Sequence, residues 1–152
     1  MSMELSTAAT LAKSMLQQFG LNYTFQFDRG RRRFGYCDGV EKVISLSAPL
    51  TTLNTEETVR GVVLHEIAHA LVGNRHGHDR TWRAKLLEIG GDGKRCYKRE
   101  AVVMPPPKYS ATCGVCQTVY SKYRRPRGSR ICTKCYNTSV DESKYLAILE
   151  FK

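Results

Sequence analysis

The most informative stretch of the sequence is His65-Glu66-Ile67-Ala68-His69. Two histidines four positions apart on a helix point the same way, about one turn apart, so both imidazoles can bind a single Zn²⁺. Glu66 would lie beside the metal, where it can accept a proton from a water molecule on the zinc. The stretch therefore predicts a helix that carries a catalytic zinc and a glutamate base.

The flanking residues predict that this helix runs from about residue 56 to residue 71. Asn54 precedes two glutamates as a helix N-cap would, and Gly73 is a typical stop. An apolar stripe would lie roughly opposite the histidines, and it consists of Val59, Val63, Ile67 and Ala70. We therefore expect the two imidazoles to face away from the packed side of the helix, toward a cleft.

A catalytic zinc usually has three protein ligands and one open position. Downstream of the motif, the candidates for the third ligand are His76, His78 and, ranked last, Glu88. The metzincin class would require glycine at position 72 and histidine at position 75. The chain has Val72 and Arg75 at these positions, so that class is excluded.

The rest of the hydrophobic pattern predicts an α+β fold. Gly30 offers a turn, Asp38-Gly39 is a hairpin signal, and Asp79 can cap a helix that follows the histidines. The expected elements are helices at 5–19 and 80–89 and strands at 21–27, 34–36 and 43–46.

A second motif consists of two Cys-x-x-Cys pairs with fifteen residues between them: Cys113, Cys116, Cys132 and Cys135. Each pair can form a knuckle whose thiolates share a metal ion, which is typical of a zinc ribbon. Four thiolates leave no open position, so this zinc would be structural. A redox dithiol is the alternative, but it needs only one such pair. Cys37 and Cys96 stand alone, and we expect small buried residues there.

The segment between the two cysteine pairs combines basic and aromatic residues: Tyr120, Lys122, Tyr123, Arg124, Arg125, Arg127 and Arg130. Lysine and arginine can neutralise phosphates, and tyrosine can stack on exposed bases. We expect a hairpin with Gly128 at its tip that contacts DNA, with single-stranded or partly unpaired DNA preferred. A solvated basic loop is the alternative. For Arg31-Arg32-Arg33 the preferred interpretation is a solvated face beside a turn, and a second DNA contact is the alternative.

Composition and charge favour a basic protein of two domains. The chain has 152 residues and a formal net charge of +10. The stiff run Pro105-Pro106-Pro107 separates an expected domain at 1–104 from an expected domain at 105–152. Residues 107–152 hold nine Lys and Arg against three Asp and Glu, so the basic density lies in the cysteine module. No apolar stretch reaches the ~18 residues of a membrane span, and the first residues do not resemble a signal peptide. We therefore expect a cytoplasmic monomer with no membrane partner.

The chain resembles the SprT-like zinc metalloproteases, the group that includes Spartan. The cysteine module is similar to the C-terminal zinc ribbon of bacterial and phage SprT-like proteins. The stretches that carry the resemblance elsewhere are Phe34-Gly35-Tyr36-Cys37, Ile44-Ser45-Leu46-Ser47 before Leu50, His65 to Ala70, and His76-Gly77-His78-Asp79 followed by Trp82.

This resemblance implies a zincin-like protease domain with a helix, a three-stranded sheet, the motif helix and a further helix, followed by a small β zinc ribbon. In the family, the third ligand is the histidine four residues before the tryptophan, which is His78. His65, His69 and His78 would then hold a catalytic zinc, Glu66 would be the base in peptide-bond hydrolysis, and the chain would bind two Zn²⁺. In Spartan-like relatives, DNA-binding regions direct proteolysis to DNA-bound substrates, and the setting here would be a bacterium or a phage-infected cell.

The expected function is therefore a zinc metalloendopeptidase that acts on DNA-bound or DNA-crosslinked proteins. One alternative is a nucleic-acid-binding zinc-ribbon protein whose zincin domain is a non-catalytic scaffold; the intact Glu66 argues against it. The other alternative is a regulatory protease that cuts one specific partner without DNA. The sequence does not separate this last hypothesis from the first.

Overall fold

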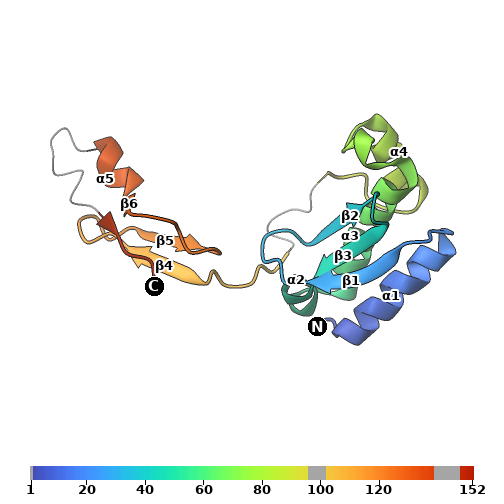
Figure 1. Cartoon of the computed structure of the whole chain (residues 1–152), viewed down its shortest axis with the longest axis horizontal. Coiled ribbons are helices and arrows are strands. Elements are labelled where there is room, and N and C mark those ends of the chain that lie inside the picture. Colours follow the sequence, from blue (N-terminus) through green and yellow to red (C-terminus); the bar gives the residue numbers. More distant parts are fainter. Residues whose placement is uncertain (1, 96–101, 139–147) are drawn as a thin grey trace. The chain divides into compact units, whose positions relative to one another are not determined.

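The structure, a computed structural model, describes residues 2–95, 102–138 and 148–152. The chain divides into two compact units, Met1–Pro105 and Pro106–Lys152, so the division falls inside the proline run. Figure 1 labels the elements of both units. Cys96, one of the two lone cysteines, lies outside the described residues. No helix in the described ranges is long and apolar enough to cross a membrane.

The first unit is the expected α+β domain, and all the predicted helices and strands are present within a few residues of their expected ends. The short helices α2 and η1 were not anticipated. In chain order the elements are α1 (Leu5–Gln18), β1 (Thr24–Asp28), β2 (Gly35–Asp38), β3 (Val43–Ser47), α2 (Ala48–Leu53), α3 (Glu56–Val72), η1 (Asn74–His76) and α4 (Arg80–Glu88).

The three strands form a mixed sheet in the order β1-β3-β2. The predicted turn at Gly30 does not close a hairpin, because β3 lies between the first two strands. Ile44 of β3 pairs in parallel with Phe25 of β1 and in antiparallel with Cys37 of β2. The Asp38-Gly39 hairpin does form between β2 and β3, and Asp38 Oδ1 accepts the backbone N–H of Val40 at 2.9 Å. Strand β3 takes the central place, where its apolar residues Ile44 and Leu46 are fully buried.

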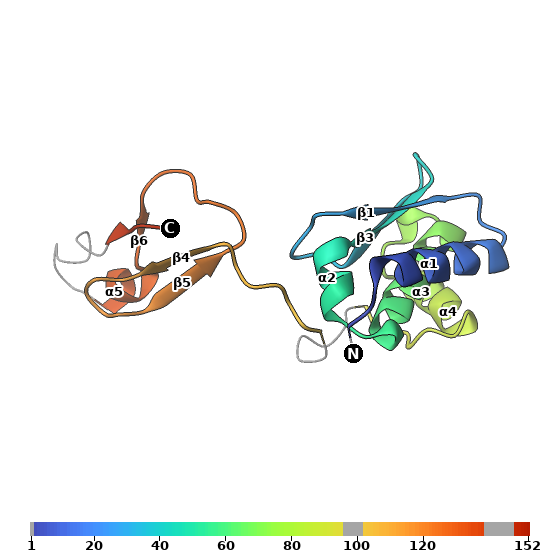
Figure 2. The ribbon, with the colours of Figure 1, turned by 90° about the horizontal axis from the view of Figure 1, so that it is seen from below.

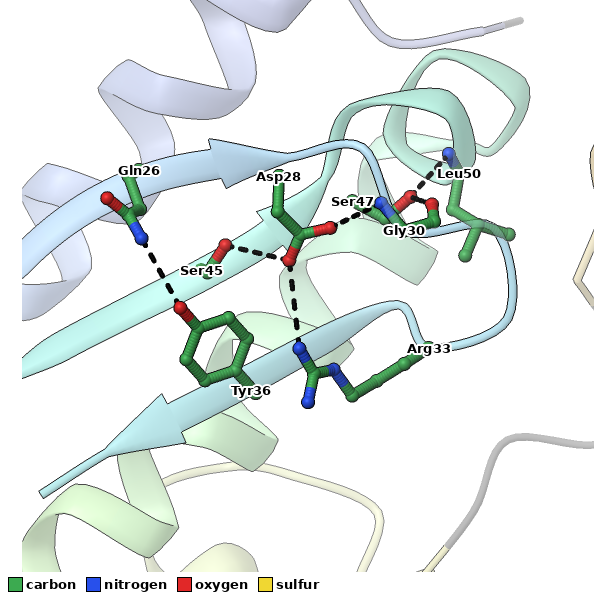
Figure 3. Close-up of polar contacts among 8 residues, drawn as sticks. All are labelled: Gln26, Asp28, Gly30, Arg33, Tyr36, Ser45, Ser47 and Leu50. Carbon is green, nitrogen blue, oxygen red and sulfur yellow. Dashed lines mark hydrogen bonds and ion pairs between the residues drawn. The ribbon is translucent and has the colours of Figure 1, made fainter. Parts of the chain in front are cut away.

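Helices α1, α3 and α4 lie on the same side of the sheet, as Figure 2 shows. The small residues Ala8 and Ala12 of α1 are fully buried in the core, which also contains Ile44 and Leu46 from the sheet. The strand residues between these apolar ones point to the opposite face, which is polar. That face carries Gln26, Asp28, Tyr36, Ser45 and Ser47 (Figure 3).

The N-cap of helix α3 lies one residue later than predicted. Thr55 is the N-cap, and its hydroxyl accepts the N–H of Thr58. Asn54 is instead buried, and its side chain forms two hydrogen bonds with the backbone of Val103, at 2.8 and 2.9 Å. It thereby fastens the segment before the proline run to the first unit. Gly73, with a φ of 86°, ends the helix as expected.

The second unit is a small β module. Strand β4 (Tyr109–Thr112) pairs with β5 (Val119–Lys122), and β6 (Arg130–Ile131) pairs with β7 (Ile148–Leu149). Helix α5 (Thr133–Thr138) follows β6. The predicted hairpin between the two cysteine pairs is therefore wrong, because the strands on either side of it pair elsewhere. The basic segment is a loop between two different strand pairs, and Gly128 turns it with a φ of 73°.

Candidate metal centres

Three histidines converge on one point between α3 and the start of α4. His65 and His69 come from α3, and His78 lies two residues before the first residue of α4. The Nε2 atom of His78 is 2.9 Å from that of His65 and 3.2 Å from that of His69. Ligand nitrogens at ~2.0–2.1 Å from a tetrahedral zinc lie ~3.3 Å apart. The three donors therefore fit a zinc ion, with a fourth position left for water or substrate.

Trp82 packs against all three imidazoles. Its ring centroid is 4.7 Å from that of His65, 5.3 Å from that of His69 and 4.6 Å from that of His78. Only 1% of Trp82 is exposed. The indole thus forms a rigid wall behind the histidines and limits the rotation of their rings.

The α3 histidines are neutral at neutral pH. Burial, with the neighbouring histidines as a smaller cause, lowers the pKa of His65 and of His69 to about 4. A histidine must lose its proton to bind a metal, so these two rings need no deprotonation at pH 7.

The other two candidates for the third ligand have different partners. His76 Nδ1 lies 2.9 Å from Asp79 Oδ2, and Asp79 caps α4 by accepting the N–H of Trp82 through its other oxygen. Glu88 pairs with Lys85 on the surface of α4 at 2.7 Å. Neither belongs to the group of potential ligands in the described residues, which here consists of His65, His69 and His78.

Glu66 lies beside the histidine group and is almost fully buried, with 6% exposed. It packs under Gly35 of β2, where a Cβ atom would lie 3.0 Å from Glu66 Oε1. Burial raises the pKa of Glu66 to about 8, although the charge of Arg33 acts in the opposite direction. A carboxyl group whose pKa is near neutral pH can both take up and release a proton, as a general base in hydrolysis must. The sequence predicted Glu66 as the base, but it did not indicate that Gly35 leaves room for the Glu66 side chain.

The strand that passes Glu66 is an edge of the sheet, because β2 pairs with β3 on one side only in the described sheet. The carbonyl of Phe34 points to β3, where it accepts the N–H of Ser47 at 2.7 Å. By alternation, the N–H and carbonyl of Gly35 point to the free edge. At the far end of this edge, Asn74 Nδ2 donates to the carbonyl of Cys37 at 3.1 Å. Asn74 was not anticipated, since only the tertiary structure brings it to β2.

The four paired cysteines form a second group of potential ligands. The Sγ atoms of Cys113 and Cys135 are 3.8 Å apart, and those of Cys116 and Cys132 are 3.5 Å apart. Thiolates at ~2.3 Å from a tetrahedral zinc lie ~3.8 Å apart, so this group also fits zinc. It is closed, because all four positions are occupied by protein.

Two neighbouring side chains support the thiolates. Hydrogen bonds with Thr118 lower the pKa of Cys116 to about 6, which favours the metal-binding thiolate. The hydroxyl of Tyr120 lies 3.1 Å from Cys132 Sγ, and the ring packs against the small core of the module. Tyr120 was predicted as a base-stacking residue. In the structure its hydroxyl contacts a cysteine of the metal group and its ring packs on the core of the module.

The other predicted DNA contacts lie in the basic loop. Tyr123 is half-buried, and the charged residues are exposed: Lys122, Arg124, Arg125, Arg127 and Arg130. Gly128 supplies the turn among them. This loop is thus a basic surface fixed at one end by β5 and at the other end by β6.

Comparison with known families gives one match. The family model of the SprT-like family matches residues 5–101, which include the three histidines and Glu66. The four cysteines lie outside the matched range. No curated protein matches the chain.

Proposed function

Because the chain belongs to the SprT-like family, we propose that it is a zinc-dependent metalloendopeptidase that cleaves proteins bound or crosslinked to DNA. The observation that carries the proposal is the convergence of three histidine nitrogens beside a buried carboxyl group. The Nε2 atom of His78 lies within hydrogen-bond distance of both His65 and His69, and Glu66 comes from the same helix as those two. This is the donor set and the base that metal-assisted hydrolysis requires.

The histidines would hold the zinc, and Glu66 would move the protons. The chemistry that zinc supplies there is Lewis-acid polarisation of the scissile carbonyl together with a more acidic water molecule. Glu66 accepts the proton of the attacking water and passes it to the leaving amine. Its burial supports this second step, because the raised pKa lets the protonated carboxyl persist near neutral pH.

The free edge of β2 would hold the substrate. An extended peptide can add to a sheet edge through main-chain hydrogen bonds, which gives binding with weak side-chain specificity. Gly35 offers its N–H and carbonyl on this edge, and the same residue packs on Glu66. Asn74 already occupies the carbonyl of Cys37, so it would end the paired segment there.

The second unit supports the DNA-directed part of the proposal. It holds nine Lys and Arg against three Asp and Glu, and five of the basic residues lie in or beside the loop at 122–130. The closed cysteine group has no open position for catalysis, so its zinc would shape the loop that contacts phosphates.

Proteolysis of a DNA-binding protein with and without single-stranded DNA tests the proposal. Wild type should cleave with DNA present, and Glu66→Gln should lose nearly all activity while it keeps its zinc. Glu88→Gln, which changes an exposed glutamate of α4, is the matched control and should cleave as wild type does. Residual activity of Glu66→Gln within about tenfold of wild type, or ~1.4 kcal/mol of barrier, is incompatible with a general base.

The same assay separates the two alternatives. Cleavage that is independent of DNA would favour a regulatory protease. Zinc binding and DNA binding without any cleavage would favour a non-catalytic scaffold. Either result would contradict the proposed function.

A further inference from the structure

A second basic surface lies on the first unit, far in sequence from the cysteine module. Residues 29–33 directly follow β1. They include four arginines, and all four are exposed: Arg29, Arg31, Arg32 and Arg33. We call residues 29–33 the arginine loop. The sequence alone suggested a solvated face for its last three residues.

The base of the arginine loop is fastened to the polar face of the sheet (Figure 3). Asp28 Oδ1 accepts the N–H of Gly30 at 2.6 Å, and the hydroxyl of Ser47 donates to the carbonyl of Gly30. Ser45 Oγ donates to the other oxygen of Asp28 at 3.0 Å. Because both serines are fully buried, these bonds are shielded from water and fix the backbone path of the loop.

The last arginine completes this base. The guanidinium of Arg33 lies 4.2 Å from the ring centroid of Tyr36 and 4.0 Å from Asp28. Gln26 Nε2 donates to the Tyr36 hydroxyl at 3.3 Å, so the aromatic ring is itself held in place. The two carboxylate oxygens of Asp28 are used by Gly30, Ser45 and Arg33. The loop therefore presents its positive charge from an ordered backbone.

We propose that the arginine loop is a second phosphate-binding surface for nucleic acid, separate from the basic loop of the cysteine module. Guanidinium groups bind phosphate oxygens in a bidentate manner, and an ordered loop loses little conformational entropy on binding. A nucleic acid offers the evenly repeated phosphate charges that several neighbouring arginines can bind. The inference rests on the proposed association with DNA.

The arginine loop lies close along the chain to the part of β2 that packs on Glu66. Arg33 stands two residues before Gly35, a distance of about 7 Å in extended chain, and Gly35 packs directly on Glu66. DNA held at the arginine loop would therefore bring an attached protein to the substrate edge of β2.

The test compares two double variants of the full chain that change the net charge equally. Arg29→Gln with Arg32→Gln removes two charges from the loop and leaves its fastening bonds intact. Arg60→Gln with Arg83→Gln removes two exposed charges from α3 and α4 and is the matched control. Binding of a labelled single-stranded oligonucleotide is measured at several salt concentrations. Zinc content and thermal unfolding should be those of wild type in both variants.

The loop variant should bind on the order of tenfold more weakly at ~0.15 M salt, and its salt slope should be flatter by about 1.4, as expected for two lost phosphate contacts. The control should match wild type. Equal binding by the loop variant and wild type, or equal losses in both double variants, would overturn the inference. So would displacement of the oligonucleotide by polyglutamate as readily as by unlabelled oligonucleotide of equal charge, which would indicate an acidic protein partner.

A third double variant, Arg124→Gln with Arg125→Gln in the basic loop of the cysteine module, separates this inference from the proposed function. If it loses affinity and the loop variant does not, only the arginine-loop inference fails. If wild type itself does not bind the oligonucleotide, the DNA-directed function fails, and the arginine-loop inference fails with it.

Discussion

A Cβ atom on Gly35 would lie 3.0 Å from Oε1 of Glu66, so a residue without a side chain on β2 leaves the space that the Glu66 carboxyl occupies. The same Cβ atom would lie 3.0 Å from Cγ1 of Val62, one turn earlier on α3. Helix and strand thus approach each other so closely that neither neighbour can move aside freely.

Gly35→Ala should therefore displace Glu66 and lower the rate of peptide hydrolysis by tenfold or more, or ~1.4 kcal/mol of barrier. The zinc content should stay at the wild-type value, because the histidines lie on other positions of the helix. Gly61→Ala is the control: nothing lies within 4 Å of its added Cβ, and alanine should stabilise α3 by ~0.5–1 kcal/mol. Kinetics and thermal unfolding of the two variants check both statements, and full activity in Gly35→Ala would contradict the first.

His78→Ala should lose the zinc of the histidine group, whereas His76→Ala should keep it. The reason is geometric: the Nε2 atom of His78 lies close to both α3 histidines, and His76 instead pairs with Asp79. Metal analysis after gel filtration measures the zinc per chain in each variant. Loss of zinc from the His76 variant alone would reverse the assignment.

The fluorescence of Trp82 should report the metal directly. It is the single tryptophan of the chain, and its ring contacts all three histidines. Co²⁺ in place of zinc has unpaired electrons, which quench an indole at this range, so titration with Co²⁺ should strongly reduce the emission. In His78→Ala the emission should stay close to the metal-free value at the same Co²⁺ concentrations. Equal quenching in both proteins would mean that cobalt binds elsewhere.

Tyr120→Phe should weaken the zinc of the cysteine group by about 10–100-fold, as is typical for loss of a hydrogen bond to a metal ligand. The hydroxyl that is removed lies 3.1 Å from Cys132 Sγ. Tyr123→Phe, which changes a half-buried tyrosine of the basic loop, should leave the affinity unchanged. Competition with a chromophoric chelator measures this. Wild type should hold two zinc ions per chain and Cys113→Ser one.

Cys37 should react slowly with iodoacetamide at pH 8. Burial, with smaller contributions from the charges of Glu66 and Asp38, raises the pKa of its thiol to about 12. The reactive thiolate is therefore nearly absent at pH 8, and alkylation should be on the order of a hundredfold slower than that of an ordinary thiol. The rate should rise about tenfold for each pH unit up to pH 10. Peptide mapping at several pH values checks this, and a rate that levels off near pH 9 would contradict it.

The sequence by itself determined the three longest helices and the three strands of the first unit, and the direction of side chains within each of them. His65 and His69 share a face because four residues make about one helical turn, and Asp79 and Gly73 mark helix ends through bonds to residues three or four positions away. The two cysteine pairs are equally local, because each knuckle needs only three consecutive peptide units. These features depend on short-range geometry, which residue spacing expresses directly.

The tertiary structure decided which elements meet. The turn predicted at Gly30 lies between the first two strands, yet β3 separates them in the sheet, because burial of Ile44 and Leu46 outweighs the local turn signal. The basic loop of the cysteine module is not a hairpin for a similar reason, since β5 pairs with the preceding strand β4 and β6 pairs with the later strand β7. The contact of Gly35 with Glu66 depends on the packing of helix against sheet. Packing joins residues that are distant in sequence, and no local spacing encodes it.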